Sequence, residues 1–352
     1  MNTDKVRLGF VGVGSMGQAA HLKNYATLPD CAVMAIAELR PRLAREVAAR
    51  YGVPRVYADH REMLAAEKLD GIVASQPFTR HGVLVPELLE ARMPVFIEKP
   101  LAGSVQAGER ILRALKESGT WVMVGYNKRS DPATAWAREQ IEQLRASGEL
   151  GLLRYVRITM PAGDWIAGGF RELVGSGEPV PPLEHEPPAP DMDAETYNAY
   201  LSFVNYYIHQ VNLMRHLLGE RYRVTYADPS GVLLAVGSAS GVAGTIEMSP
   251  YTTTLDWQES ALAAFEHGYV KLNLPAPLSC NRPGTAEVFR DPGGGRTPET
   301  VVPQLPWIHA MLQQAANFVK AIRGEALPPC GAEEALEDLR VAREYIRLLR
   351  GC

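Results

Sequence analysis

The chain has 352 residues, more than one ordinary hydrophobic core supports, so two domains are expected. Its net charge is -4 and it has no basic block, which argues against nucleic acid as a partner. No apolar run is long enough to span a membrane, and the N-terminus lacks a signal-peptide core, so a cytoplasmic protein is expected. The cysteines are scattered without a C-x-x-C pair, which favours reduced thiols over a disulfide framework or a metal site: Cys31, Cys280, Cys330 and Cys352.

The first third of the chain alternates strand-like and helix-like segments. Buried strands are predicted at 6–12, 31–38, 69–76, 93–100 and 120–127. Helices are predicted at 16–28, 41–52, 59–68 and 81–92, with Asp59 as an N-cap. This alternation predicts an α/β domain with a mostly parallel sheet, over residues 1–126.

The pattern changes at Asn127, where a second domain is expected to begin and to run over 127–352. A Pro- and Gly-rich stretch at 175–190 is interpreted as a surface loop that could act as a lid, with disorder as the alternative. The rest predicts an α/β domain with a largely antiparallel sheet. Its strands are expected at 152–160, 221–249 and 260–274, and its helices at 131–147, 194–219, 309–324 and 333–351. The last two helices are expected to cover hydrophobic surface and could pack back on the first domain.

The segment "GVGSMG" carries a dinucleotide-binding spacing. Gly12, Gly14 and Gly17 form G-x-G-x-x-G between a predicted strand and a predicted helix. These glycines permit the tight turn, the approach of pyrophosphate to the backbone and close helix packing. Backbone donors at the helix start, around Ser15 and Met16, would hold the phosphates. The alternative is an ordinary Gly-rich turn.

Glu38 ends the second predicted strand, about 20 residues after the glycines, where an acid binds the ribose hydroxyls. A carboxylate there repels a 2′-phosphate, which favours NAD. Arg40 could instead receive that phosphate, which would favour NADP.

Polar residues follow three neighbouring strand candidates. Ligands bind beyond the carboxyl ends of parallel strands, so these residues are expected near the nicotinamide. Lys99 could donate to a substrate oxygen and stabilise charge during hydride transfer; the alternative is a solvated lysine held by Glu98. The residues at these ends are Gln76, Pro77, Glu98, Lys99, Pro100 and Asn127.

The sequence resembles the Gfo/Idh/MocA oxidoreductases, a family that includes glucose–fructose oxidoreductase and inositol dehydrogenase. The resemblance rests on "GVGSMG", "SQPFTRH", "FIEKPLAGS", "VGYNKRSDPA", "IHQVNLMRHLLGE" and the C-terminal "NFVKAIRGEALPPCGAEEALEDLRVA". It implies a Rossmann domain plus an α/β domain with an open, mostly antiparallel sheet. It also implies a nicotinamide cofactor, a sugar or cyclitol substrate, and a homo-oligomer, dimer or tetramer, built by packing the open sheets.

By resemblance Lys99 is the catalytic lysine, and His81 is a structural histidine. The family's second motif, Asp-x-x-x-His with a later Asp, is altered here. Asn205 stands at the first acid position, His209 at the histidine and Asn212 at the later acid. Helical spacing predicts that Asn205 and His209 share one face and that Asn212 lies near it. His209 is predicted to be the base, with a core histidine as the alternative.

Two further residues are predicted to contact substrate. Arg129, beside Lys128, follows the strand predicted at 120–127, and a solvated loop pair is the alternative. Trp165 could form an apolar platform for a sugar ring, or belong to the core.

The expected activity is NAD-dependent hydride transfer between nicotinamide and a hydroxyl-bearing carbon of a sugar-like or cyclitol substrate. Two alternatives remain. The first is a redox-neutral lyase or glycosidase-type enzyme that retains NAD. The second is a catalytically inactive cofactor-binding sensor, suggested by the missing carboxylates.

Overall fold

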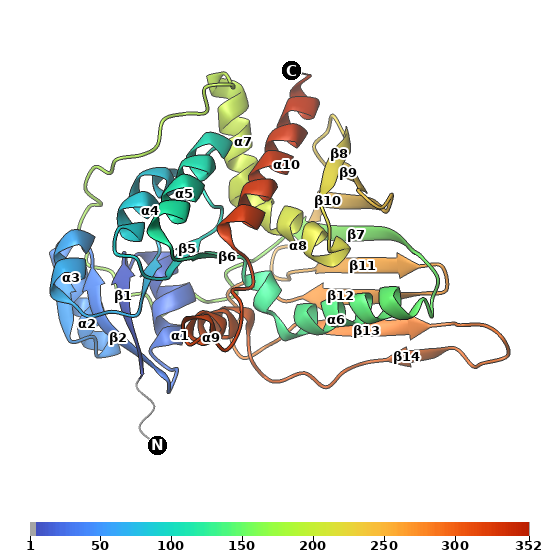
Figure 1. Ribbon diagram of the computed structural model, residues 1–352, viewed down its shortest axis with the longest axis horizontal. Coiled ribbons are helices and arrows are strands. Elements are labelled where there is room, and N and C mark those ends of the chain that lie inside the picture. The colour runs from blue at the N-terminus through green and yellow to red at the C-terminus, as the bar shows by residue number, and fades with distance from the viewer. Residues whose placement is uncertain (1–4, 352) are drawn as a thin grey trace. The chain divides into compact units, whose positions relative to one another are not determined.

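The computed structural model describes residues 5–351, coloured along the chain in Figure 1. Its contacts divide the chain into two compact units. The first contains the residues up to Tyr126 together with Gly168–Tyr197 and Met311–Leu339. The second contains Asn127–Ala167, Asn198–Ala310 and the residues from Arg340 onward.

The sheet of the first unit is parallel, as predicted for a Rossmann fold. Its strand order is β3-β2-β1-β4-β5-β6, so the order reverses beside β1. The strands are β1 (Val6–Val11), β2 (Cys31–Ala37), β3 (Arg55–Tyr57), β4 (Gly71–Ala74), β5 (Val95–Glu98) and β6 (Val122–Gly125). Ligands bind where strand order reverses in such sheets, which places the site at the carboxyl ends of β1, β2 and β4.

Local signals explain the helices of the first unit. Asp59 accepts a hydrogen bond from the Glu62 N–H at 2.9 Å and starts α3 as predicted, and Gly52 ends α2 with φ +67°. Helix α5 is not among the helices predicted from the sequence, although Ser104 caps its start. The helices are η1 (Gly17–Leu22), α1 (Lys23–Tyr25), α2 (Pro41–Tyr51), α3 (His60–Ala66), η2 (Phe78–Arg80), α4 (His81–Leu89), α5 (Val105–Ser118) and α9 (Ala310–Ile322).

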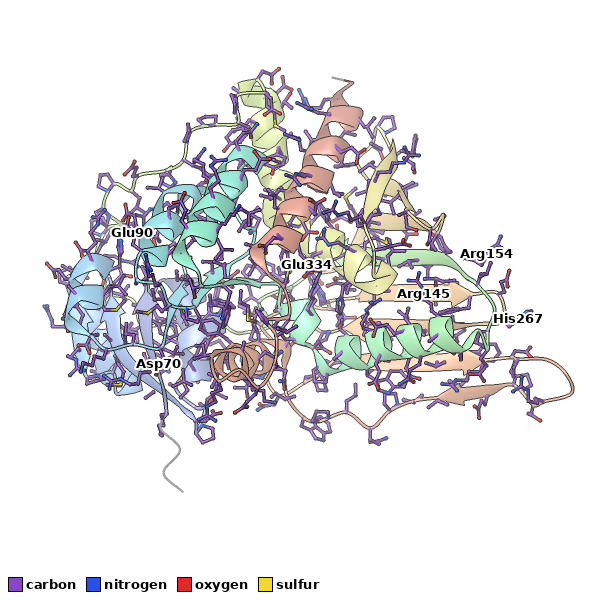
Figure 2. All side chains as sticks on the ribbon, viewed as in Figure 1. Asp70, Glu90, Arg145, Arg154, His267 and Glu334 are labelled. Carbon is purple, nitrogen blue, oxygen red and sulfur yellow. The ribbon has the colours of Figure 1, made fainter. Side chains whose placement is uncertain are left out.

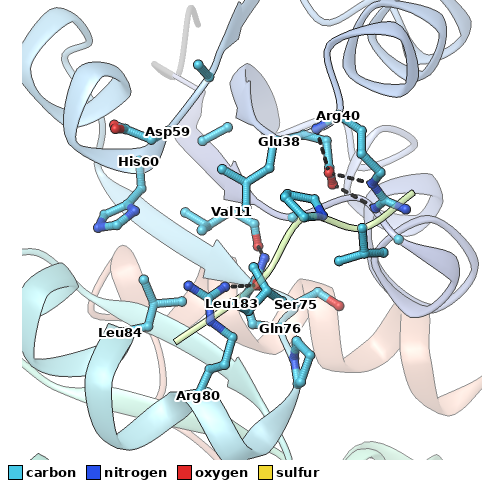
Figure 3. Close-up of a pocket in the computed structure, with 18 of the residues that line it drawn as sticks. Val11, Glu38, Arg40, Asp59, His60, Ser75, Gln76, Arg80, Leu84 and Leu183 are labelled. Atoms are coloured by element: carbon cyan, nitrogen blue, oxygen red, sulfur yellow. Dashed lines mark hydrogen bonds and ion pairs between the residues drawn. The ribbon is translucent and has the colours of Figure 1, made fainter. Parts of the chain in front are cut away.

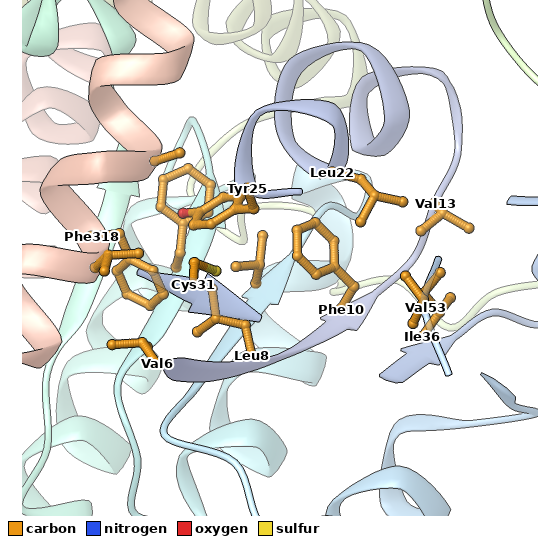
Figure 4. Close-up of a cluster of buried hydrophobic side chains, with 14 of the residues drawn as sticks. Val6, Leu8, Phe10, Val13, Leu22, Tyr25, Cys31, Ile36, Val53 and Phe318 are labelled. Carbon is orange, nitrogen blue, oxygen red and sulfur yellow. The ribbon is translucent and has the colours of Figure 1, made fainter. Parts of the chain in front are cut away.

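Helix α9 completes the hydrophobic core of the first unit (Figure 4). Phe318 is fully buried, and its ring packs edge-on against three aromatic rings, with centroids 5.5 to 6.3 Å apart. These rings belong to Tyr25, Phe96 and Trp121. The core therefore joins the sheet to a helix about 200 residues later in the chain.

The second unit contains the predicted, mostly antiparallel sheet. Its strand order is β14-β13-β12-β11-β7-β10-β9-β8, and β7 and β10 form its parallel pair. Helix α6 (Pro132–Ser147) packs on β12 and β13, as Figure 1 shows. The strands are β7 (Leu153–Ala162), β8 (Tyr222–Ala227), β9 (Leu233–Ser238), β10 (Ala243–Thr252), β11 (Glu259–Phe265), β12 (Gly268–Leu274), β13 (Thr285–Arg290) and β14 (Glu299–Val301).

The long helix predicted at 194–219 is divided, which corrects our sequence analysis. α7 (Ala194–Tyr206) ends one residue before Tyr207, and α8 (Ile208–Leu218) follows it. The N–H groups of Gln210 and Val211 both donate to the carbonyl oxygen of Tyr207, so the turn tightens locally. Arg145 of α6, labelled in Figure 2, donates to the Leu218 carbonyl at 2.6 Å and satisfies the end of α8. The last helix is α10 (Ala332–Arg350).

None of the helices within residues 5–351 is both long enough and apolar enough to cross a membrane. Cys31, Cys280 and Cys330 are thiols that form no disulfide within the described residues, and Cys352 lies outside them.

Candidate active site

The glycine loop joins β1 to η1 and has the form that a dinucleotide needs. Gly12 has φ +87°, a conformation that side chains disfavour. A Cβ on Gly17 would lie 2.8 Å from the Gly12 carbonyl oxygen, so only glycine permits this close packing. At Gly14 a Cβ would meet only Arg40, at 3.7 Å. Packing therefore does not require glycine at position 14, and the bare backbone there fits the approach of a pyrophosphate.

A cavity of about 320 Å³ opens beside this loop (Figure 3). It brings together most of the residues predicted to bind the cofactor: Gly12, Gly14, Ser15, Glu38, Arg40, Gln76 and Pro77. Met16 and Gly17 lie outside its lining and begin η1. The cavity also contains groups that our sequence analysis did not select, namely Asp59, His60, Arg80 and the loop residues Val180, Pro181 and Leu183.

The carboxylate of Glu38 is fixed at the carboxyl end of β2. Its Oε2 accepts the Val13 N–H at 3.0 Å, and its Oε1 accepts the Arg40 Nε–H at 2.8 Å. Burial raises the pKa of Glu38, but hydrogen bonds from Arg40 and Val13 lower it more, so its pKa lies below the ordinary value. Glu38 is therefore charged at neutral pH and suited to bind ribose hydroxyls.

Gln76 and Arg80 form one polar wall of the cavity (Figure 3). The Gln76 amide donates to the Val11 carbonyl at 3.3 Å and accepts from Arg80 Nη1 at 2.6 Å. Desolvation lowers the pKa of Arg80, which still leaves the guanidinium protonated. This wall places a cation beside the space in which phosphates would bind.

Lys99 follows β5, between β4 and β6 in the sheet, so the predicted alignment of three strand ends is confirmed. Glu98 is buried, and its side chain faces His21 and the backbone N–H of Lys99. Neither Glu98 nor Lys99 lines the cavity beside the glycine loop, and the role of Glu98 in binding the cofactor stays a prediction. The Lys99–Pro100 peptide is cis, and buried His81 lies 3.1 Å from the Pro100 carbonyl, through Nδ1.

Residues 127–130 form the short helix η3 (Asn127–Ser130), which is buried in the second unit. Lys128 is ion-paired to Glu259, and Arg129 donates to the Asn212 Oδ1 at 2.7 Å. The alternative of a solvated loop pair is therefore wrong. Asn212 is 1% exposed and accepts a hydrogen bond from Arg129. Its side chain therefore holds Arg129 in place, whereas the sequence predicted that it would lie near His209.

Helices α7 and α8 carry the altered family motif. Asn205 is exposed near the end of α7, while His209 is half-buried in the first turn of α8. The interruption at Tyr207 lies between them, so continuous helical spacing does not relate the two side chains as predicted. Trp165 is half-buried in the loop after β7, and its carbonyl accepts from the Leu278 N–H at 3.3 Å.

Glu259, at the start of β11, joins α8 to η3, a connection that no local sequence signal indicates. Its Oε1 accepts from Gln210 Nε2 at 2.7 Å, and its Oε2 accepts from Trp257 Nε1 at 3.1 Å and pairs with Lys128. A cavity of about 420 Å³ beside this network is lined partly by Asp164, Trp257, Glu259, Asn273 and Arg282. Such polar groups beside an indole ring can bind hydroxyl-bearing molecules.

Comparisons with known proteins agree with this architecture. The family model GFO_IDH_MocA, described as "Oxidoreductase family, NAD-binding Rossmann fold", matches residues 6–126. An inositol 2-dehydrogenase from Rhizobium meliloti is 27% identical, over 97% of this chain and 96% of that protein.

Two solved structures share the fold. A putative NADPH-dependent oxidoreductase from Desulfitobacterium hafniense has a TM-score of 0.77 at 14% identity, covering 100% of this chain and 97% of that one. A levoglucosan dehydrogenase in complex with NADH and levoglucosan has a TM-score of 0.71 at 19% identity, covering 99% and 98%. The parallel sheet, the glycine loop and the match to the family model together identify residues 6–126 as an NAD-binding Rossmann domain of the Gfo/Idh/MocA oxidoreductase type.

Proposed function

We propose that this protein is an NAD-dependent dehydrogenase that moves hydride between nicotinamide and a hydroxyl-bearing carbon of a cyclitol or sugar-like polyol. The observation that carries the proposal is the position of Lys99. Lys99 follows β5, the strand next to β4, at the carboxyl end of the sheet. Gln76 follows β4 at the same end and borders the cofactor cavity. An ammonium group there is suited to polarise a substrate oxygen.

Each residue would have a distinct function in the reaction. When bound, NAD supplies the hydride acceptor. Gly14 and Glu38 would hold its pyrophosphate and ribose. Lys99 would orient and polarise the substrate hydroxyl, and His209 would accept the hydroxyl proton, directly or through water. Asn205, Arg129, Trp165 and Asn127 remain proposed contacts to substrate or cofactor.

The substrate class rests on likeness to the inositol 2-dehydrogenase and on polar groups in the second unit. Glu259, Asn273 and Arg282 offer both donors and acceptors, which a ring bearing several hydroxyls requires. We also propose a homo-oligomer formed through the open sheet of the second unit, which the family resemblance implies.

A substrate screen tests this function directly. Purified protein would be incubated with NAD+ and individual inositols, aldoses and anhydrosugars, and NADH would be followed at 340 nm. We expect turnover with at least one cyclitol or sugar. The Lys99→Ala variant should lose it, whereas Lys116→Ala, which alters an exposed lysine on α5, should keep it. Absence of NADH formation with every compound would contradict the proposed net oxidation.

A second candidate function is redox-neutral chemistry on retained NAD. It is favoured by Val180, Pro181 and Leu183, which belong to a distant loop and border the cofactor cavity. Such a loop could slow cofactor release. Native mass spectrometry of the protein as purified would detect a bound nucleotide. Stoichiometric NAD together with substrate conversion but no net NADH would favour this candidate over a dehydrogenase.

A further inference from the structure

Residues 174–186, here called the strap, lie along the Rossmann domain within the first unit. Val174 exchanges two hydrogen bonds with the Gln18 amide, at 2.9 and 3.1 Å. Near the other end, the Glu186 N–H donates to the Thr79 carbonyl at 2.8 Å. Between these anchors, the strap borders the cofactor cavity, as the yellow-green segment at Leu183 in Figure 3 shows. The strap is therefore part of the cofactor site.

Glu178 of the strap occupies the N-terminus of α2. Its carboxylate accepts the Arg42 N–H at 3.1 Å and the Leu43 N–H at 2.9 Å. Burial raises the pKa of Glu178, but the hydrogen bond from Leu43 and others lower it more, so its pKa lies below the ordinary value and it is charged at neutral pH. The backbone donors that a helix offers to an anion are thus already satisfied by an internal carboxylate.

The nearby arginines are also paired with carboxylates. Arg40 Nε and Nη2 donate to Glu38 at 2.8 and 3.1 Å, and the charge of Glu178 acts on Arg40 as well. Arg42 Nε donates to Glu46 at 2.8 Å. An arginine near the acid of the second strand is what accommodates the 2′-phosphate of NADP in this fold. Here each such cation already has a negative partner.

We propose that Glu178 is a specificity-determining residue that excludes the 2′-phosphate of NADP. Glu38 alone repels a 2′-phosphate, yet Arg40 could turn toward it and neutralise it. Glu178 opposes this rearrangement, because it adds a second negative charge and fills the backbone anion site at α2. NAD lacks the 2′-phosphate and is not repelled by Glu178. The strap would therefore discriminate between NAD and NADP at the one cavity that it borders.

Calorimetric titration with NAD+ and NADP+ tests the proposal without any sugar or cyclitol, so its result is independent of the substrate class proposed above. The variants are Glu178→Ala and Glu178→Gln, the second of which keeps the size of the side chain. Glu172→Gln is the matched control, since Glu172 carries the same charge but is 84% exposed and pairs with Arg50.

In both Glu178 variants, the ratio of Kd for NADP+ to Kd for NAD+ should fall by about 3- to 10-fold, the scale of one anion at a helix N-terminus. The control should keep the wild-type ratio. If both cofactors weaken in parallel, Glu178 only anchors the strap and the proposal is wrong. A wild-type ratio in Glu178→Gln would likewise overturn it, because the charge would then have no effect.

Discussion

His21 Nε2 lies 2.5 Å from Glu98 Oε1, and both side chains are buried. The other oxygen of Glu98 accepts the backbone N–H of Lys99 at 3.1 Å. Burial raises the pKa of Glu98, but the hydrogen bond from His21 and the charges of His21 and Lys99 lower it more, so its pKa lies below the ordinary value. The first helix after the glycine loop therefore fixes the backbone that carries the proposed catalytic lysine.

The first prediction concerns this pair. His21→Ala leaves the Glu98 carboxylate buried without its partner, which should lower the free energy of unfolding by about 3–5 kcal/mol. His60→Ala is the control, because His60 pairs with a half-exposed Glu87 at 2.9 Å and should cost about 0–1 kcal/mol. Urea unfolding followed by circular dichroism measures both. Equal decreases in the free energy of unfolding of the two variants would contradict the prediction that the buried His21–Glu98 pair contributes more to stability than the half-exposed pair.

The second prediction concerns Lys99. Lys99→Ala should lower kcat by about 10²-fold or more, because a polarising group is lost, while Kd for NAD+ changes little. Stopped-flow turnover and calorimetry would be compared with Lys116→Ala. Near-normal turnover in Lys99→Ala would make this residue an ordinary loop lysine.

The third prediction concerns proton transfer by His209. If His209 is the base, log(kcat/KM) for oxidation should rise with pH through one inflection, since only the neutral imidazole accepts a proton. His209→Ala should remove the inflection and most of the activity. Asn205→Asp places a carboxylate across the helix interruption from His209, and it should move the inflection to higher pH if that carboxylate reaches the imidazole, because a carboxylate beside it stabilises the protonated ring. An unchanged inflection in His209→Ala would assign the base to another group, with Tyr206, Tyr207 and Lys99 the next to test.

The fourth prediction concerns Glu186, at the end of the strap. Burial raises its pKa to about 7, and its Oε2 accepts the Gly82 N–H at 3.1 Å. The folded protein therefore holds this proton at pH values where the unfolded chain has released it. The contribution of Glu186 to the free energy of unfolding should be greatest below its unfolded pKa near 4.5. It should fall by up to about 3 kcal/mol as pH rises toward 7.

Thermal unfolding of wild type and Glu186→Gln between pH 5 and pH 8 measures this effect. The amide cannot titrate, so the difference in Tm between the two proteins should change over that interval and level off above pH 7. Glu184→Gln is the control, because Glu184 is an exposed acid of the strap two residues earlier, and its backbone carbonyl accepts from Arg80. If the two variants follow the same pH dependence, Glu186 does not keep its proton in the folded protein.

Local patterns in the sequence were enough to predict the glycine loop and the strand ends that line the candidate cofactor cavity. Gly12 requires its positive φ within a single turn, and Glu38 is placed by the strand that precedes it. The position of Lys99 after a buried strand likewise follows from one short segment and the parallel order of its neighbours. These predictions succeeded because strand alternation, glycine conformation and helix caps act over a few residues.

Only the tertiary structure decided which distant groups meet at these positions. Glu98 bonds to His21 across 77 positions, Lys128 to Glu259 across 131, and Glu178 to Leu43 across 135. Nothing in the sequence of the Pro-rich stretch distinguishes Glu178, whose carboxylate binds the N-terminus of α2, from the acids that face solvent. Such pairs arise only when the sheet order and the path of the strap bring the elements together, because a hydrogen bond depends on the distance between atoms and not on their separation along the chain.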